Sequence, residues 1–342
     1  MQVMRLNKKI IRKNPIPVVN NLITSTDTAM EETYYWFALA RNEYISLKTF
    51  NAVVAFSSKN NISAQEIFSL TPEDFAGELN LDIALANSAL FGIKNSQLQK
   101  EFTELTKKNI RFLHYSDKGY PDKIKNFYTL PPPLYCTGDI SLLHQKSVGI
   151  SGSRNAGKNG IVNANRLAGL AAASGISVIT GHARGIDEAA HSGALTAGGN
   201  TLVILPTGIL NYWKNDVLLE ENGSCCVVSL FAPQKSFTKW TAVERNHLIA
   251  ALSDILFIVE ARIPSGSLMQ GKIGLKYGKP TFVFDNGFDG NYFLIQKGGI
   301  PVTITEIPKV LNSMDYFYPA IDFCLNQYEV TQIWEPRTVS NF

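Results

Sequence analysis

The sequence lacks the features that mark several common classes of protein. Its 342 residues include only four cysteines, with no C-x-x-C pair and no metal-ligand spacing, which argues against a disulfide framework and a structural zinc site. No apolar run approaches the length of a membrane span, and the amino terminus has no signal-peptide core. Charged residues make up 18% of the chain and hydrophobic residues 45%, a balance typical of folded globular proteins. We therefore expect a cytoplasmic protein without metal, cofactor or membrane attachment.

Two common nucleotide-binding signatures are also missing. A dinucleotide fold would show G-x-G-x-x-G after its first strand and an acidic residue after its second, whereas this chain has SGSRNAGKNG and then TGHARG. No strand ends in the G-K-[ST] of a Walker loop, which argues against ATP hydrolysis. Nor do the motifs contain a nucleophile, a base and an orienting side chain together. We therefore expect no catalytic residues and no enzymatic activity.

Basic residues are concentrated at the start of the chain. Five of them, and no acid, lie in the first thirteen residues: Arg5, Lys8, Lys9, Arg12 and Lys13. Without these five charges the formal net charge of +3 becomes −2, so anion binding by the rest of the chain requires local focusing of charge. The basic segment is either a solvated tail, a nucleic-acid-binding arm or a targeting address.

The first half of the chain changes pattern twice. Between Met30 and about Lys107, apolar residues recur at helical spacing, and Thr71 followed by Pro72 predicts a capped helix start. We expect four to six short helices here. Residues 109–139 contain three consecutive prolines and a Tyr-Pro pair, so we expect this segment to run extended.

From Ser147 to about Ile304, short apolar runs alternate with helical segments. This alternation predicts an α/β fold, a Rossmann-like doubly wound parallel sheet covered by helices on both faces. The apolar run that contains Cys225 and Cys226 is one expected strand, and residues 215–222 are one expected helix. The expected domains are a basic tail (1–30), a helical domain (31–107), an extended lead-in (108–146), the Rossmann-like domain (147–304) and a carboxyl-terminal tail (305–342).

Three junctions between a strand and a helix carry glycine, serine and arginine. Parallel strands end at one edge of their sheet, so these junctions are expected to converge on one anionic ligand. Glycine lets the backbone approach a phosphate, and arginine offers a planar fork of donors. The expected binding residues are Gly152, Ser153, Arg154, Arg184, Gly185, Arg245, Asn246, Ser265, Gly266 and Ser267.

Several of these positions also have ordinary structural interpretations. Asp187 is either a helix-start carboxylate or orients Arg184 or a backbone amide. His191, four residues later, is either packed in the core or forms an acid–base or metal pair with Asp187. The segment Ser265–Ser267 is either a phosphate cradle or a serine cap. Glu260 is expected to face the site and to bond an arginine, a base edge or a sugar hydroxyl.

Four motifs resemble, in their order and spacing, those of the DNA-processing protein family DprA, also called Smf. They are GSR, G-x-ARGID-x-x-AH, RN-x-x-IA-x-LS and E-x-x-x-x-SGSL. HYSDKGYPDKIKNFYTLPPPLYCTGD and DGNYFLIQKGG extend the resemblance, and residues 31 to about 105 match the family's helical domain loosely. The resemblance thus covers roughly residues 31–304. Departures include His182, where the family usually has leucine, and His247, where a second arginine is common. The family's carboxyl-terminal winged-helix domain is not evident. The chain is thus identified as a divergent member.

The resemblance implies a small helical domain of SAM or helix-hairpin-helix type before the sheet. It also implies a dimeric single-stranded DNA-binding mediator that protects incoming DNA and loads a RecA-type recombinase during uptake of foreign DNA. Ser153, Arg154 and Arg184 would then contact DNA, while Arg245, Asn246 and the Ser265–Ser267 loop would shape the pocket. Stacking is expected from Tyr212, Trp213 or Phe288. The alternative is a small-nucleotide-binding or nucleotide-processing Rossmann protein, with a sensor in a defence or mobile-element system as a further version.

Overall fold

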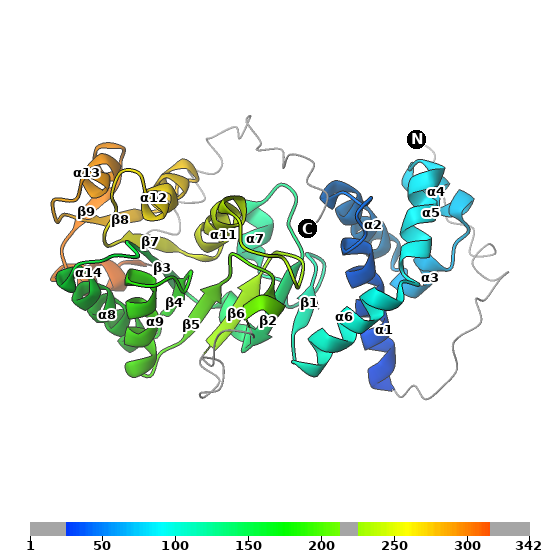
Figure 1. Cartoon of the computed structure of the whole chain (residues 1–342), viewed down its shortest axis with the longest axis horizontal. Coiled ribbons are helices and arrows are strands. Elements are labelled where there is room, and N and C mark those ends of the chain that lie inside the picture. Colours follow the sequence, from blue (N-terminus) through cyan, green and yellow to red (C-terminus); the bar gives the residue numbers. More distant parts are fainter. Residues whose placement is uncertain (1–24, 213–224, 315–342) are drawn as a thin grey trace. The chain divides into compact units, whose positions relative to one another are not determined.

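The computed structural model describes residues 25–212 and 225–314, which form two compact units. Of the described residues, the helical unit comprises 25–108 and 114–118, and the sheet unit comprises 109–113, 119–212 and 225–314. Figure 1 shows the helices of the first unit in blue to cyan and the mixed second unit in green to red. Among the described residues, none of the helices combines the length and the apolar character needed to cross a bilayer.

Six helices make up the helical unit, as the apolar spacing predicted. They are α1 (Ser25–Ala40), α2 (Leu47–Asn60), α3 (Ala64–Phe68), α4 (Pro72–Leu79), α5 (Ile83–Gly92) and α6 (Ser96–Lys107). Side chains cap the starts of α2 to α6, because the first backbone N–H groups of a helix lack internal acceptors. Thr71 accepts from the N–H of Asp74, with Pro72 at the first helical position, which confirms that expected helix start.

One nine-stranded sheet forms the centre of the second unit, in the order β1-β2-β6-β5-β4-β3-β7-β8-β9. The strands are β1 (Arg111–Leu113), β2 (Leu134–Gly138), β3 (Ser147–Ser151), β4 (Ser177–Thr180), β5 (Thr201–Ile204), β6 (Cys225–Ser229), β7 (Ile255–Ile258), β8 (Thr281–Phe284) and β9 (Ile300–Val302). Strands β3 to β9 pair in parallel, and β2 is antiparallel to both β1 and β6. The Rossmann-like, doubly wound prediction is confirmed.

Helices cover both faces of this sheet (Figure 1). Those that follow the strands are α8 (Lys158–Ala173), α9 (Ile186–Thr196), α10 (Ile209–Tyr212), α11 (Lys239–Leu252), α12 (Gly266–Lys276), α13 (Asp289–Gln296) and α14 (Ile307–Asn312). Residues of α8, α9 and α14 share one core cluster with β3, β4, β7 and β8, while α12 and α13 pack in another. Because both faces are buried, the central strands are continuous apolar runs, which is why the sequence revealed them.

The lead-in from 108 to 146 is less extended than expected. It contains the helix α7 (Asp122–Phe127) and the 3-10 turn η1 (Ile140–His144), in addition to β1 and β2. Pro121 immediately precedes α7, where a missing N–H costs nothing, so the proline starts a helix instead of preventing one. At the other end, Ile307 and Leu311 of α14 are buried in the core, although the sequence assigned them to a tail. The expected helix at 215–222 lies outside the described residues.

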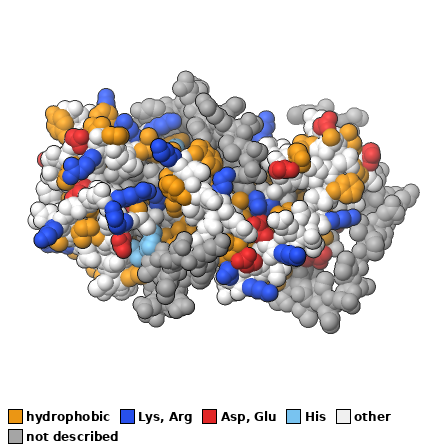
Figure 2. Space-filling view, viewed as in Figure 1, with side chains coloured by type: hydrophobic (Ala, Val, Ile, Leu, Met, Phe, Trp, Pro, Cys, Tyr) orange, Lys and Arg blue, Asp and Glu red, His pale blue; other side chains and the backbone are white. Residues whose placement is uncertain are grey.

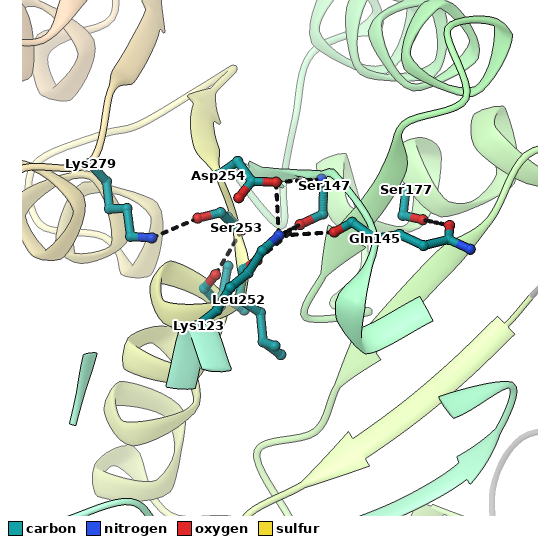
Figure 3. A network of polar contacts seen from close by, with 9 residues as sticks. Lys123, Gln145, Ser147, Ser177, Leu252, Ser253, Asp254 and Lys279 are labelled. Carbon is teal, nitrogen blue, oxygen red and sulfur yellow. Dashed lines mark hydrogen bonds and ion pairs between the residues drawn. The ribbon is translucent and has the colours of Figure 1, made fainter. Parts of the chain in front are cut away.

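Polar contacts tie α7 to the edge of the sheet where the parallel strands begin (Figure 3). Lys123 Nζ donates to Asp254 Oδ2 at 2.8 Å and to the carbonyl of Gln145 at 2.9 Å. The backbone N–H of Ser147 donates to the same carboxylate oxygen at 2.8 Å. Burial lowers the pKa of the nearby Lys279 to about 8, which the charge of Asp254 partly opposes. This edge is held together by internal bonds, and the candidate site lies at the opposite edge.

Candidate functional site

The three predicted junctions meet at the edge where the parallel strands end, which we call the carboxyl edge. Strands β4, β3 and β7 are neighbours in the sheet, so the loops that follow them lie next to one another. These loops are residues 152–157 after β3, 181–185 after β4 and 259–265 after β7. Figure 2 shows lysine and arginine side chains spread over the visible face of the sheet unit, with acidic and hydrophobic side chains between them.

The first two loops are bonded to each other and present two arginines, and we call them the arginine loops. Arg184 Nη2 donates to Asn155 Oδ1 at 2.6 Å. The N–H of Ile186, at the start of α9, donates to the carbonyl of Ser153 at 3.3 Å. Both Arg154 and Arg184 are exposed, while Ser153 is partly buried. Two exposed arginines therefore lie on adjoining loops that are bonded to each other.

Close approach of the arginine loops requires two glycines. Gly185 has a φ of 90°, a region that favours glycine, and a β-carbon there would collide with the carbonyl of Ser153. A β-carbon on Gly152 would collide with the side chain of Ile186. Gly152 and Gly185 were predicted as phosphate-approach positions, and their observed contacts bring the two loops together.

A buried charged pair lies beneath the loops. Asp187 accepts from the N–H of Gly181 at 3.0 Å, and a β-carbon on Gly181 would collide with the guanidinium of Arg245. Burial raises the pKa of Asp187 and lowers the pKa of Arg245, and the attraction between the two charges opposes both shifts. The charge of Arg154 also lowers the pKa of Arg245, so the buried and the exposed arginine lie close together. Asp187 thus holds a backbone amide, one of the interpretations left open.

Arg245 and Asn246 are part of the site's floor. Their residues are only 6% and 8% exposed, because α11 packs against the sheet here. Arg245 Nη1 donates to the carbonyl of Ile204 at 3.3 Å. Asn246 Nδ2 donates to the carbonyl of Gly266 at 3.5 Å, which links α11 to the third loop. These two side chains position the loops, whereas Arg154 and Arg184 are open to a ligand.

In the third loop the serines are used internally. Ser265 caps α12 by accepting from the N–H of Leu268 at 3.0 Å, and the buried Ser267 donates to the carbonyl of Glu260 at 3.0 Å. Gly266 is exposed, and a β-carbon there would meet only open space. The serine side chains therefore fit the serine-cap interpretation. Only the exposed backbone of Gly266 is accessible to a ligand as part of the predicted phosphate cradle.

Glu260 does not do what the sequence suggested. Its side chain is buried and accepts from the N–H of Gly157 at 3.2 and 3.3 Å, instead of bonding an arginine or facing a ligand. The first N–H groups of α8 need an acceptor, because its N-cap residue Gly157 has no side chain that could cap the helix. A β-carbon on Gly160 would collide with the same carboxylate. Glu260 therefore caps α8 from the loop that follows β7 and fixes the first arginine loop.

Aromatic and histidine side chains complete the carboxyl edge. Tyr212 is buried, Phe288 lies 4.7 Å beneath the guanidinium of Arg262, and Trp213 lies outside the described residues. Phe237 and Lys239 are exposed where α11 begins, at the same edge, and were not among the predicted site residues. Their signal in the sequence is an aromatic and a basic residue just before the Arg-Asn motif.

His191 is packed at 2% exposure, its ring edge-on to His182 with 5.2 Å between centroids. Asp187 bonds the backbone of Gly181, so the packing interpretation of His191 is the one that the geometry supports. Within residues 25–212 and 225–314, no group of three histidine, cysteine or acidic side chains is placed to hold a metal ion. His182 belongs to the second arginine loop. Its contact with the ring of His191 was not predicted from the sequence.

Comparison with known proteins gives consistent matches. The profile of the family described as DNA recombination-mediator protein A matches residues 111–315. Protein Smf of Borreliella burgdorferi is 28% identical over 238 residues, 68% of this chain and 74% of that protein. DNA processing protein DprA of Streptococcus pneumoniae is 31% identical over 222 residues, 62% of this chain and 76% of that protein.

Solved structures agree with the sequence matches. The X-ray structure of DprA from Streptococcus pneumoniae superposes with a TM-score of 0.65 at 26% identity, covering 79% of this chain and 95% of that one. DNA processing protein A from Helicobacter pylori, described with its single-stranded DNA binding mode, superposes with a TM-score of 0.50 at 26% identity, covering 60% and 96%. This chain therefore belongs to the DNA recombination-mediator protein A family, also named DprA or Smf.

Proposed function

We propose that this chain binds single-stranded DNA at the carboxyl edge and acts as a non-enzymatic recombination mediator. The observation that carries the proposal is the pair of exposed arginines on two loops that are bonded to each other through Arg184 and Asn155. Arginine forks suit phosphate oxygens, and two arginines on adjoining loops suit phosphates of one strand. The Helicobacter pylori relative, described as binding single-stranded DNA, supports this choice of ligand.

The rest of the site fits a scaffold that holds these arginines still. Asp187 and Glu260 each accept from a backbone N–H of an arginine loop, and Arg245 supports the floor. A ligand that contacts prearranged donors loses less of its binding energy to ordering of the site. Phe237 and Lys239, at the start of α11, extend the same edge with an aromatic surface and a further cation. We propose that the strand continues over them.

The finer role is proposed from the family. We propose that the chain works as a homodimer in DNA uptake and delivers the bound strand to a RecA-type recombinase. The test is recombinase filament formation on single-stranded DNA that is already covered by single-strand-binding protein. Addition of this chain should shorten the lag of filament formation, and an Arg154→Ala, Arg184→Ala double variant should not. An unchanged lag with wild-type protein would reject the delivery role while leaving DNA binding standing.

Binding itself is tested by removal of one arginine at a time. Arg154→Ala and Arg184→Ala should each weaken binding of a labelled oligonucleotide by about 1–3 kcal/mol, the range for hydrogen bonds to charged groups. Arg166, exposed in the middle of α8, provides the matched control, because Arg166→Ala removes the same charge away from the carboxyl edge. Equal losses in all three variants would show unspecific attraction and would refute the site. Affinity that saturates with a single nucleotide would instead favour the small-nucleotide alternative.

A further inference from the structure

Four rings and one carboxylate gather where α7, α11 and α12 meet, and we call them the Glu244 cluster. They are Glu244 and His247 of α11, Phe127 and Tyr128 at the end of α7, and Tyr277 after α12. The ring centres of Phe127 and Tyr277 lie 4.3 Å apart, those of Phe127 and Tyr128 5.2 Å, and those of His247 and Tyr277 5.7 Å. All four ring-bearing residues are partly exposed, so the cluster reaches the surface.

Glu244 is the acidic member of this cluster and has no cation beside it. The residue is only 6% exposed, and none of the ion pairs among residues 25–212 and 225–314 includes it. Burial alone raises its pKa to about 7, and the nearby Lys276, whose Nζ lies 5.6 Å from the ring centre of Tyr277, does not oppose this. A buried carboxylate without a cation destabilises a fold, and such costs are retained mainly at functional sites.

The hydroxyl of Tyr128 adds an unused hydrogen-bonding group. Among the described residues it is buried and has no partner, although buried hydroxyls usually have one. Burial raises the pKa of Tyr128 well above its usual value and the charge of Glu244 raises it further, which places the phenol close to the carboxylate. The same two causes raise the pKa of Tyr277. Both phenols stay protonated at neutral pH, and each offers one donor and one acceptor.

A primary ammonium ion fits these groups. It carries one positive charge and three N–H donors, which suit a carboxylate and a phenol oxygen, and aromatic ring faces attract the same charge. The position of Lys276 over Tyr277 shows that a ring of this cluster accepts an ammonium group. An anion would be repelled by Glu244, and an apolar ligand would leave the carboxylate unpaired. The described part of the chain has no group of three metal-binding side chains here or elsewhere.

Position 247 explains why the chain itself supplies no cation. His247 follows Glu244 by three residues on α11, a spacing at which side chains of one helix are neighbours. The sequence resemblance placed a second arginine here in the family, and its charge would stand next to the carboxylate. Burial, together with the charge of Lys276, lowers the pKa of His247 to about 4, so this imidazole is neutral at pH 7. The carboxylate is therefore left for an outside cation.

We propose that the Glu244 cluster binds the primary ammonium group of an external ligand, either a free polyamine or a lysine side chain of a partner protein. The carboxylate of Glu244 and the phenol oxygen of Tyr128 accept its N–H bonds, and the rings of Phe127 and Tyr277 flank its charge. This binding function goes beyond the proposed function and does not depend on DNA binding at the carboxyl edge.

The test is calorimetric titration of the full chain, free of nucleic acid, with spermidine and with a short peptide that carries one lysine. At least one of the two should bind with one-to-one stoichiometry. Tighter binding of spermidine would identify a free polyamine as the source of the ammonium group, and tighter binding of the peptide would identify a protein. Tyr128→Phe, which keeps the ring and removes the hydroxyl, should weaken binding about threefold.

Three variants that each raise the net charge by one at neutral pH show where the ligand binds. Glu244→Gln removes the charged acceptor and should weaken binding at least about tenfold. His247→Arg keeps the carboxylate but supplies a cation from within the chain, so it should weaken binding to a similar extent. Glu104→Gln changes an exposed residue of α6 and should leave the affinity unchanged.

The affinity should also rise with pH. The ammonium group favours the ionised form of Glu244, so binding of the lysine peptide should tighten about tenfold from pH 6 to pH 8, while the lysine stays charged. His247, Tyr128 and Tyr277 keep their protonation states over this range. Glu244→Gln should remove the dependence on pH.

The contrary results are equally definite. Failure of both ligands to bind, or binding that Glu244→Gln and His247→Arg leave unchanged, would overturn the inference. A loss in Glu104→Gln equal to that in Glu244→Gln would also overturn it, because the attraction would then be unspecific. Glu244→Gln is expected to fold, since it replaces an unpaired buried charge by a neutral side chain of similar shape. Its oligonucleotide binding should match that of wild-type protein, so the proposed function is tested separately.

Discussion

At the scale of single residues, burial divides the three arginines of the site into two roles. Arg154 and Arg184 are exposed, whereas Arg245 is buried beside Asp187 and beneath Gly181. The family resemblance implied this division, with Arg154 and Arg184 at the DNA and Arg245 shaping the pocket, but the residue types alone could not give it. Exposure in the folded chain separates the residues that a ligand can touch from those that hold the loops in place.

Replacement of the buried arginine should mainly affect stability. Arg245→Leu leaves Asp187 buried without its nearby positive charge, so the free energy of unfolding should fall by about 2–4 kcal/mol. Arg154→Ala, at the surface, should change it by less than about 0.5 kcal/mol. Urea denaturation followed by circular dichroism measures both. A stable Arg245→Leu variant would mean that Arg245 does not support the floor.

Glu244 gives a pH-dependent prediction. Glu244, in α11, is only 6% exposed, and burial raises its pKa from 4.5 to about 7. The folded state therefore binds a proton that the unfolded chain has released between these two values, and stability falls as the pH rises through this range. Glu244→Gln should stabilise the protein by about 1–3 kcal/mol at pH 8 and have little effect near pH 4. A constant difference from pH 4 to pH 8 in urea titrations would contradict the raised pKa.

At the scale of secondary-structure elements, the contacts of α7 show where the lead-in gains its order. Lys123, in this helix, bonds Asp254 just before β7, and its side chain is 21% exposed. On the same helix, Lys125 pairs with Asp122 at 2.9 Å, but that partner's side chain is 84% exposed. The two ion pairs have similar lengths and differ in burial, which makes them a matched comparison.

Loss of the buried pair should cost more than loss of the exposed one. Lys123→Met removes the ion-pair partner at 2.8 Å from a buried carboxylate and should lower the free energy of unfolding by about 1–3 kcal/mol. Lys125→Met should lower it by less than about 0.5 kcal/mol, because exposed ion pairs are weak. Thermal unfolding monitored by calorimetry would show the contrast. Equal effects of the two substitutions would mean that the Lys123–Asp254 pair stabilises the fold no more than the exposed pair does.

The sequence predicted elements well where local pattern determines them. The apolar strands β3 to β8 and the start of α4 at Thr71 follow directly from periodicity and capping. It missed α7, because a proline was interpreted as a barrier although Pro121 stands at the helix start. It also misjudged Glu260, whose partner Gly157 is 103 residues away in sequence. Contacts of that kind depend on how β7 and α8 pack, which no local pattern contains.

At the scale of the whole molecule, charge is arranged locally instead of globally. Without the five basic residues at its start, the chain has a formal net charge of −2, yet two arginines are exposed together at the carboxyl edge. DNA binding at a specific site and DNA binding by the basic amino-terminal segment both weaken as salt is added. Only binding at the specific site should change when Arg154 is replaced. Arg154→Ala should reduce the dependence of the logarithm of the binding constant on the logarithm of salt concentration by somewhat less than one unit. An unchanged slope would place the bound phosphate elsewhere.

The most direct measurement is fluorescence anisotropy with single- and double-stranded oligonucleotides of increasing length across a salt series. The full chain is compared with a variant in which Arg5, Lys8, Lys9, Arg12 and Lys13 are changed to glutamine, and with Arg154→Ala in each background. We expect affinity that grows with length, prefers single strands, persists without the five amino-terminal charges and falls with Arg154→Ala. Binding that disappears with those five charges, or that ignores Arg154→Ala and length, would contradict a strand-binding site at the carboxyl edge.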